Sequence, residues 1–237
     1  LIVPLGLALL LLRAVPRDRL QLVGLFTIIS IGALFLSASR GGLLTFLSQL
    51  CLLGFLVWVR RAGRKSLALA TAIILLAGAF VTWLGVGRTF ERFSQLWAED
   101  ISHNIRMLMF KDSWQIFLDH PWAGTGAGTL ITVYPQYASS DHGMVVDHAH
   151  NDYLEMLAET GLVGALCSLA FIVLLFRSAL ANLQLDKNCF LQAVRAGTLV
   201  ACSGLLLHSL VDFNFHIPSN ALLFFLLASL ATSSIER

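Results

Sequence analysis

A series of long apolar runs constrains this fold more than any other feature of the sequence. Each run lacks Asp, Glu, Lys and Arg, and each is near the roughly 20 residues that a helix needs to cross a hydrocarbon core. The runs cover residues 20–39, 41–59, 66–87, 160–176, 196–211 and 217–235. With 57% hydrophobic and only 13% charged residues, the chain is predicted to be all-α, a polytopic bundle of transmembrane helices.

Three further observations narrow the class of protein. Residues 1–12 are too few to cross a membrane and do not begin with methionine, so we expect the end of a truncated helix in a fragment of a longer chain. The four cysteines include no CxxC pair, which argues against a disulfide framework and a zinc site. The net charge of +2 is too small to indicate a nucleic-acid partner.

Basic residues between the runs indicate which loops face the cytoplasm, where Lys and Arg are in excess. They are Arg13, Arg17 and Arg19, then Arg60, Arg61, Arg64 and Lys65, then Arg177, Lys187 and Arg195. Counting crossings from these loops places Arg40, residues 88–151 and residues 212–216 on the outer face. We therefore expect one membrane domain, with N-terminal transmembrane helices over 1–87, an outer loop segment over 88–151 and C-terminal transmembrane helices over 152–237.

The outer loop segment is predicted to contain an amphipathic helix that lies along the membrane surface. Phe110, Trp114 and Phe117 repeat at helical spacing within residues 102–118. The charged residues of this segment, Asp112 among them, are expected on another face. Most histidines, which titrate near neutral pH, also fall on the outer face. These are His103, His120, His142, His148, His150 and His216.

A helix is predicted to begin just after His150 and Asn151. Asp152 and Glu155 resemble an acidic variant of a capping box before an apolar run. The N-terminus of that helix would place free N–H groups and a partial positive charge beside His150. This setting suits anion binding, or a neutral imidazole that accepts a proton.

Two other interpretations of His150 stay open. It can be a capping or hydrogen-bonding residue with no chemical role. Alternatively, it can join Asp147, His148 and Asp152 in a metal site, although the spacing matches no recognised zinc pattern.

Two arginines stand where a guanidinium, whose fork of donors matches phosphate, can meet a substrate. Arg40 lies in the sequence SASRGG between two runs, and at that depth it needs a partner or must reach the headgroups. Arg106 lies near the start of the amphipathic helix. The alternatives are an interfacial anchor for Arg40 and a solvent or lipid-phosphate contact for Arg106.

Two more patterns combine polar or flexible residues at short spacing. His208, Asp212 and His216 follow a four-residue spacing, which can place them on one helix face as a site, a proton path or a helix-end hydrogen-bond network. The glycine-rich sequence GTGAGT looks like a phosphate loop only superficially, because no strand precedes it and no Lys-Ser or Lys-Thr follows. It is predicted to be a turn.

These segments together resemble the O-antigen ligase family, bacterial membrane enzymes that transfer a glycan from a lipid diphosphate carrier to an acceptor. The resemblance rests on SASRGG, the long outer segment, VDFNFHIPSN, and HNDYLEMLAETGLVG with its spacing of His-Asn, nine residues, Gly, two residues and Gly. It implies three essential catalytic groups, His150, Arg40 and Arg106. The residues implied to contact substrate are Asn151, Asp212, His216 and His148.

The resemblance implies inverting, metal-independent glycosyl transfer without a cofactor, at the periplasmic face of the bacterial inner membrane. The implied donor is a glycan on undecaprenyl diphosphate, and the acceptor is a lipid A core sugar, a growing glycan or a protein hydroxyl. Membrane lipid surrounds the protein, and no nucleic acid takes part. Family members usually have more spans than this chain.

Two other classes of function are compatible with a polytopic membrane chain. A transporter, like the relatives proposed to act in bicarbonate uptake, needs midplane sites reachable from both sides, whereas nearly all polar groups here are expected at the outer face. A structural membrane protein would leave Arg40, Arg106 and His150 scattered.

Overall fold

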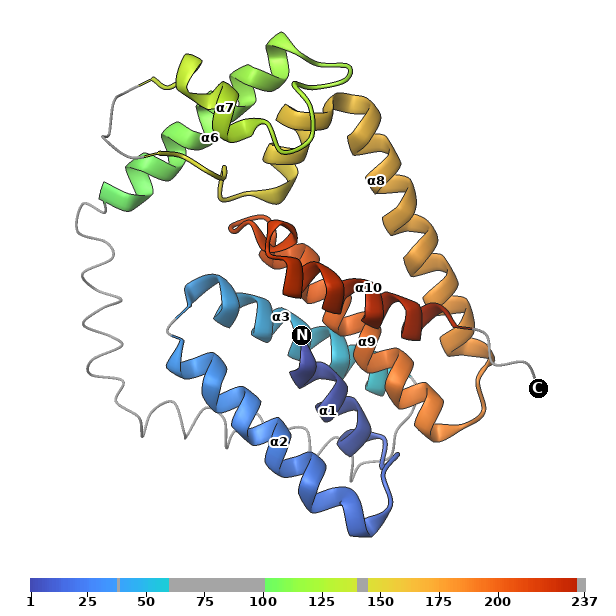
Figure 1. Ribbon diagram of the computed structural model, residues 1–237. Coiled ribbons are helices and arrows are strands. Elements are labelled where there is room, and N and C mark those ends of the chain that lie inside the picture. The colour runs from blue at the N-terminus through green and yellow to red at the C-terminus, as the bar shows by residue number, and fades with distance from the viewer. Residues whose placement is uncertain (38, 60–100, 140–144, 234–237) are drawn as a thin grey trace. The chain divides into compact units, whose positions relative to one another are not determined.

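The computed structural model describes residues 1–37, 39–59, 101–139 and 145–233 (Figure 1). Within these ranges the chain forms helices and turns with no strand, which confirms the predicted all-α class. The predicted span at 66–87 and the basic residues at 60–65 lie outside the described residues. Contacts divide the chain into two units. The first comprises Leu1–Gln95, Leu175–Leu207 and Leu222–Arg237, and the second comprises Leu96–Leu174 and His208–Ala221.

The first unit is a bundle of apolar helices. Helix α1 lies beside α2 and also contacts α3 (Figure 1). Most of α9 is buried, and its Gly197 faces α1 so closely that an added Cβ would lie 2.6 Å from the Leu5 Cα. Small residues permit such close approach between membrane helices. The helices of this unit are α1 (Ile2–Leu11), α2 (Arg17–Leu36), α3 (Arg40–Val59), the end of α8 (Asp152–Leu185), most of α9 (Cys189–His208) and most of α10 (Pro218–Thr232).

Among the described residues, α2, α8 and α9 are long and apolar enough to cross a membrane. The shorter apolar helices are α1, α10 and residues Gly41–Val57 of α3. The outward face of α2 carries large apolar side chains, including Leu25, Phe26 and Ile28, each more than half exposed. A contiguous apolar surface of this kind indicates contact with lipid. The predicted membrane helices at 20–39, 160–176 and 196–211 are thus confirmed as helices of spanning length.

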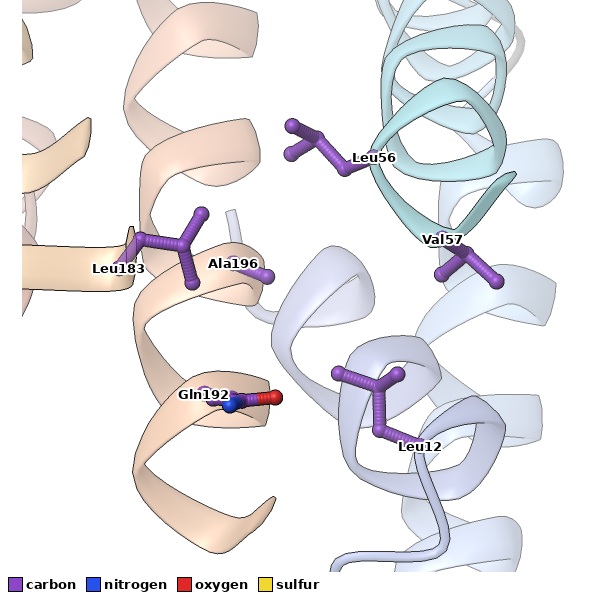
Figure 2. A pocket seen from close by; sticks show the side chains of 6 residues that line it. All are labelled: Leu12, Leu56, Val57, Leu183, Gln192 and Ala196. Atoms are coloured by element: carbon purple, nitrogen blue, oxygen red, sulfur yellow. The ribbon is translucent and has the colours of Figure 1, made fainter. Parts of the chain in front are cut away.

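A small apolar pocket lies within the first unit (Figure 2). It is lined by Leu12, Leu56, Val57, Leu183, Gln192 and Ala196. The only polar side chain among these is that of Gln192, whose Nε2 donates to the Asp186 carbonyl oxygen at 2.5 Å. The pocket therefore presents no charged group or hydroxyl that would hold a phosphate or a glycan.

The second unit packs around α6 (Ile101–Asp119), the helix predicted at 102–118. Its core includes Met109, Ile116, Leu130 and Ala158. Its other elements are α7 (Leu130–Val133), η1 (Tyr134–Gln136), η2 (Asn214–His216) and the first part of α8.

The packing of α6 buries a charged residue and leaves an aromatic one exposed. Asp112 is only 3% exposed, whereas Trp114 is 45% exposed. Asp112 accepts hydrogen bonds from the Tyr134 hydroxyl (2.9 Å) and the Ser139 backbone N–H (3.1 Å), and also from the Ser139 hydroxyl. Its carboxylate joins α6 to η1 and the loop that follows. That α6 lies along the membrane surface stays a prediction.

Helix α8 changes direction near its start, at Gly161 (Figure 1). Gly161 has φ +61° and ψ −162°, a conformation essentially reserved for glycine. The loop after α6 lies against this break, where Leu162 N–H donates to the Pro121 carbonyl (2.8 Å) and Val163 N–H donates to the Trp122 carbonyl (3.2 Å). An added Cβ at Gly161 would lie 2.5 Å from the Trp122 carbonyl carbon. The first glycine of the motif, Gly161, is therefore required because the backbone of another segment lies against it.

Candidate functional site

The candidate site lies in the second unit, where His150 adopts a left-handed backbone conformation with φ +52°. A non-glycine residue in this region costs about 1–3 kcal/mol and persists only where its neighbours impose it. On one side, Ala149 N–H donates to Glu155 Oε2 at 2.9 Å. On the other, Asp152 N–H donates to the Ser209 carbonyl at 3.0 Å. His150 is held between two anchored segments.

Asn151 caps the helix that follows. Its Oδ1 accepts from the N–H groups of Tyr153 (3.0 Å) and Leu154 (3.1 Å), two of the N–H groups that lack a helical partner. Its Nδ2 donates to the Leu210 carbonyl at 2.9 Å. The helix start is where the sequence predicted it, but Asn151 performs the capping. Both the oxygen and the nitrogen of its amide thus have partners within the protein. Substrate binding by Asn151 stays a prediction.

Three buried acidic side chains follow at helical spacing in the first part of α8. Asp152, Glu155 and Glu159 are 6%, 1% and 5% exposed. Buried carboxylates require hydrogen bonds or charged partners, and here the partners come from other segments. Glu159 accepts from the N–H groups of Gly128 (2.8 Å) and Leu130 (2.9 Å), so the glycine-rich sequence is a turn whose N–H groups are bound by a carboxylate.

His216 links two of these carboxylates. Its Nδ1 lies 3.0 Å from Asp152 Oδ1, and its Nε2 lies 3.2 Å from Glu155 Oε1. Both ring nitrogens can donate only if the ring is protonated. The hydrogen bond to Asp152 raises the pKa of His216, and the charge of Glu155 adds to this effect while burial opposes it. His216 is therefore an imidazolium over a wider pH range than an exposed histidine.

His208, Asp212 and His216 do not share a helix face. Helix α9 ends at His208, a turn carries Asp212, and His216 belongs to η2. The expectation of a helical row was wrong because the chain turns here to meet α8, and Asp152 N–H also approaches the Asp212 carbonyl (3.3 Å). The histidine and the aspartate remain near each other, with His208 Nε2 3.9 Å from Asp212 Oδ2.

The surroundings of His150 shift its pKa in the direction opposite to that of His216. Its Nδ1 is buried and has no hydrogen-bond partner among the described residues; Asp212 Oδ1 lies 3.9 Å away. The ring packs edge-on against Phe213, with centroids 5.0 Å apart. Burial lowers the pKa of His150, and the charge of Arg106 lowers it further, whereas Asp212 acts in the opposite direction. His150 therefore stays neutral down to a lower pH than an exposed histidine does, and its side chain is partly buried.

The predicted residues are found in both units. His148, His150, Asn151, Asp212 and His216 lie in contact with one another or with shared partners in the second unit. Arg106 lies in the same unit on α6, with an exposed side chain whose charge reaches His150. Arg40 is the first residue of α3 in the first unit, and its side chain is outside the described part of the structure, as are His142 and the side chain of His103.

In the described ranges, one group of side chains has the composition of a metal site. The potential ligand atoms of His148, Glu155 and His216 all lie within 4.8 Å of one another. In this structure they bond to each other, since Glu155 Oε1 accepts from His148 Nδ1 at 2.8 Å and lies near His216 Nε2. A metal ion would have to displace the proton of His216, because imidazole ligands bind metals in the neutral form. In the described structure the three side chains form a hydrogen-bond network.

Comparison with models of protein families finds a match to this chain. The family model described as O-Antigen ligase matches residues 25–169, which include Arg40, Arg106, His150 and the break at Gly161. The chain belongs to the O-antigen ligase family. A search of curated proteins finds no match.

Membership in the O-antigen ligase family assigns a general activity. The chain is a membrane protein of a family that transfers glycans from lipid-linked donors to acceptors, and it is a glycosyltransferase of the ligase or polymerase type. The sequence-predicted resemblance to this family is confirmed. Glu159 and Phe213 were not singled out from the sequence, and Glu155 was interpreted only as part of a capping box. Acidic residues at positions i, i+3 and i+7 beside an apolar run are nevertheless a signal that buried charge needs partners.

Proposed function

We propose that this O-antigen ligase family member transfers a glycan from undecaprenyl diphosphate to an acceptor hydroxyl, with His150 as the general base. The observation that carries the proposal is the imidazole of His150, whose buried Nδ1 faces Asp212 and whose backbone is held in a strained conformation in the unit that also contains Arg106. A general base must be unprotonated and within reach of the acceptor hydroxyl. Strained residues of this kind gather at active sites.

In the proposed reaction, the acceptor oxygen attacks the anomeric carbon while its proton passes to His150. The bond between that carbon and the diphosphate oxygen breaks, and the electron pair leaves with the diphosphate. A single displacement inverts the anomeric configuration. Arg106 and Arg40 are proposed to stabilise the leaving diphosphate, an effect typically worth a few kcal/mol for each well-placed donor.

The roles of the two ring nitrogens of His150 follow from their neighbours. Asp212 is the carboxylate near Nδ1, and its approach from 3.9 Å to hydrogen-bond distance would fix the proton on that atom. Catalytic hydrogen bonds are often long without substrate and tighten in the complex. Nε2 is then the atom that accepts the proton. His148 and His216 are proposed to contact the substrate from the same region.

The proposed location is the bacterial inner membrane, with the site at the periplasmic face. The positive-inside pattern of the sequence supports this orientation. The acceptor is a lipid A core sugar, a growing glycan or a protein hydroxyl, and each is tested in the experiment below.

Arg106→Gln is expected to reduce donor consumption about 10- to 100-fold, because a hydrogen bond to a charged group contributes roughly 1.5–3 kcal/mol. The assay uses the full-length protein in liposomes with a lipid-diphosphate-linked glycan and the candidate acceptors. Lys111→Gln, which removes a positive charge from the exposed surface of the same helix, is the matched control and should retain activity. If the unmodified protein consumes no donor with any acceptor, transport replaces glycosyl transfer as the favoured function.

The pH dependence of kcat/KM is expected to show a loss of activity on the acid side, centred below about pH 6.5, the ordinary pKa of histidine. The base is neutral above its pKa, so a lowered pKa of His150 extends activity toward acid pH. Arg106→Gln should move this acid limb to higher pH, because it removes a charge that lowers the pKa of His150, whereas Lys111→Gln should not. An acid limb above pH 6.5 in the unmodified protein would contradict a neutral His150.

Metal removal is expected to leave activity unchanged. The oxygen of Glu155 that faces His148 and His216 already accepts hydrogen bonds, so the reaction is proposed to proceed without a metal ion. Donor consumption is measured before and after exhaustive EDTA treatment, and again after addition of Zn²⁺ or Mg²⁺. Loss of activity that one of these ions restores would assign the His148, Glu155 and His216 group to metal binding instead.

A further inference from the structure

We infer that Glu155 is a positioning residue, which holds the backbone of His150 in its left-handed conformation so that the imidazole meets the acceptor. This inference rests on the proposed role of His150. The contacts of Glu155 are with Ala149, His148 and His216, so it acts on His150 through the backbone.

The backbone before His150 depends on this one carboxylate. Residues 145–149 have no regular secondary structure, so the Ala149 N–H has no helical partner. Glu155 Oε2 provides the acceptor at 2.9 Å, and Ala149 itself is fully buried. A buried N–H that lost this acceptor would cost about 1–3 kcal/mol, which is similar to the strain stored at His150. Without Glu155, a relaxed backbone conformation of His150 therefore has a free energy similar to that of the left-handed one.

The position of Glu155 is itself fixed from two directions. His148 Nδ1 donates to Oε1 from the segment before the helix, and His216 lies against the same oxygen from the segment after α9. His216 is in turn bonded to Asp152, and its ring centroid is 4.8 Å from that of His148. Glu155 is only 1% exposed, so water cannot replace these donors. The Glu155 carboxylate thus joins the start of α8 to the segment before His150 and to η2.

The test compares Glu155→Gln with Asp119→Asn in the full-length protein. The first substitution keeps the shape but turns an acceptor into a donor toward either Ala149 or the imidazoles. The second makes the same change of charge at an exposed carboxylate of α6. For Glu155→Gln we expect kcat to fall about 10- to 100-fold, with the KM for the lipid-linked donor changed by less than about twofold, because positioning affects the proton transfer and not donor binding.

Hydrogen exchange read by mass spectrometry separates positioning from a general loss of structure. Faster exchange is expected in the peptides that cover residues 145–151 and 208–216, with the rest of the protein unchanged. Glu155→Asp, which keeps the charge but shortens the side chain, is the second variant, and it should give a smaller effect of the same pattern. Unchanged exchange at 145–151 in a folded variant would overturn the inference, as would unfolding of both variants.

A double-mutant cycle with His150→Ala gives the decisive kinetic comparison. If Glu155 acts through His150, Glu155→Gln should have little further effect in the His150→Ala background. A purely structural role would lower activity by the same factor in both backgrounds, and this result would overturn the inference. If the unmodified protein consumes no donor, the proposed function fails, while the exchange measurement still decides whether Glu155 holds residues 145–151.

Discussion

His150→Ala is expected to lower the turnover of the lipid-linked donor about 10²- to 10⁴-fold, the range that general acid–base catalysis contributes. The substitution removes the only group proposed to take the acceptor proton. Because His150 Nδ1 has no hydrogen-bond partner within the described ranges, the substitution removes the edge-on contact with Phe213 but no hydrogen bond of that atom. The protein should therefore remain folded and still bind the donor, and steady-state kinetics should show the loss mainly in kcat.

Two variants make this experiment specific. His120→Ala removes an exposed histidine of the same unit and should leave turnover unchanged. His150→Asn removes the base but tolerates the left-handed backbone better than alanine does. Equal losses for His150→Ala and His150→Asn would attribute the effect to the missing imidazole. Full activity of either variant would remove His150 from the chemistry.

Gly161→Ala is expected to destabilise the second unit by about 2–6 kcal/mol, a sum of backbone strain and overpacking that would unfold many domains. The methyl group would lie 2.5 Å from the Trp122 carbonyl carbon, and alanine does not adopt the backbone angles of Gly161. Since the atom in the way belongs to the backbone, a change of side-chain rotamer does not relieve the contact. The loop after α6 would lose its hydrogen bonds to the start of the long part of α8.

Gly24→Ala is the matched control, because an added Cβ at Gly24 meets no atom within 4 Å and the residue lies inside α2. Alanine is favoured over glycine in a helix by about 1 kcal/mol, so this variant should be as stable as the unmodified protein or slightly more so. Thermal unfolding in detergent, with proteolysis of residues 121–126 as a local measure, compares the two. Equal stability of both variants would show that the break at Gly161 does not depend on glycine.

The helices could be predicted from the sequence because their signals are local. Apolar runs of spanning length gave α2, α8 and α9, and the motif around His150 gave both the helix start and the family. The break at Gly161 could not be inferred from hydropathy, since the apolar run 160–176 extends across Gly161 without any sign of a break. Its cause is a contact with Trp122 and Pro121, which precede it by about 40 residues.

The site was predicted less completely, because its hydrogen bonds join distant segments. The resemblance to the family singled out His150 through its motif and Arg106 through its position in the outer loop. The lowered pKa of His150 follows from a burial that sequence does not reveal. Glu155 was interpreted as part of a capping box, whereas its partners are His148, Ala149 and His216. The spacing of His208, Asp212 and His216 suggested a helix because periodicity alone cannot detect the turn after His208.

The second unit is discontinuous in sequence, and this affects how the protein is made. His216, which lies between Asp152 and Glu155, follows Asp152 by 64 residues. At a synthesis rate of roughly 5–20 residues per second, the first half of the unit waits about 3–13 seconds for its partner. During that interval α9 must enter the membrane while Asp152 and Glu155 have not yet met His216. These contacts thus form only after α9 has been made, and a ribosome that stalls within α9 leaves a chain in which Asp152 and Glu155 lack His216.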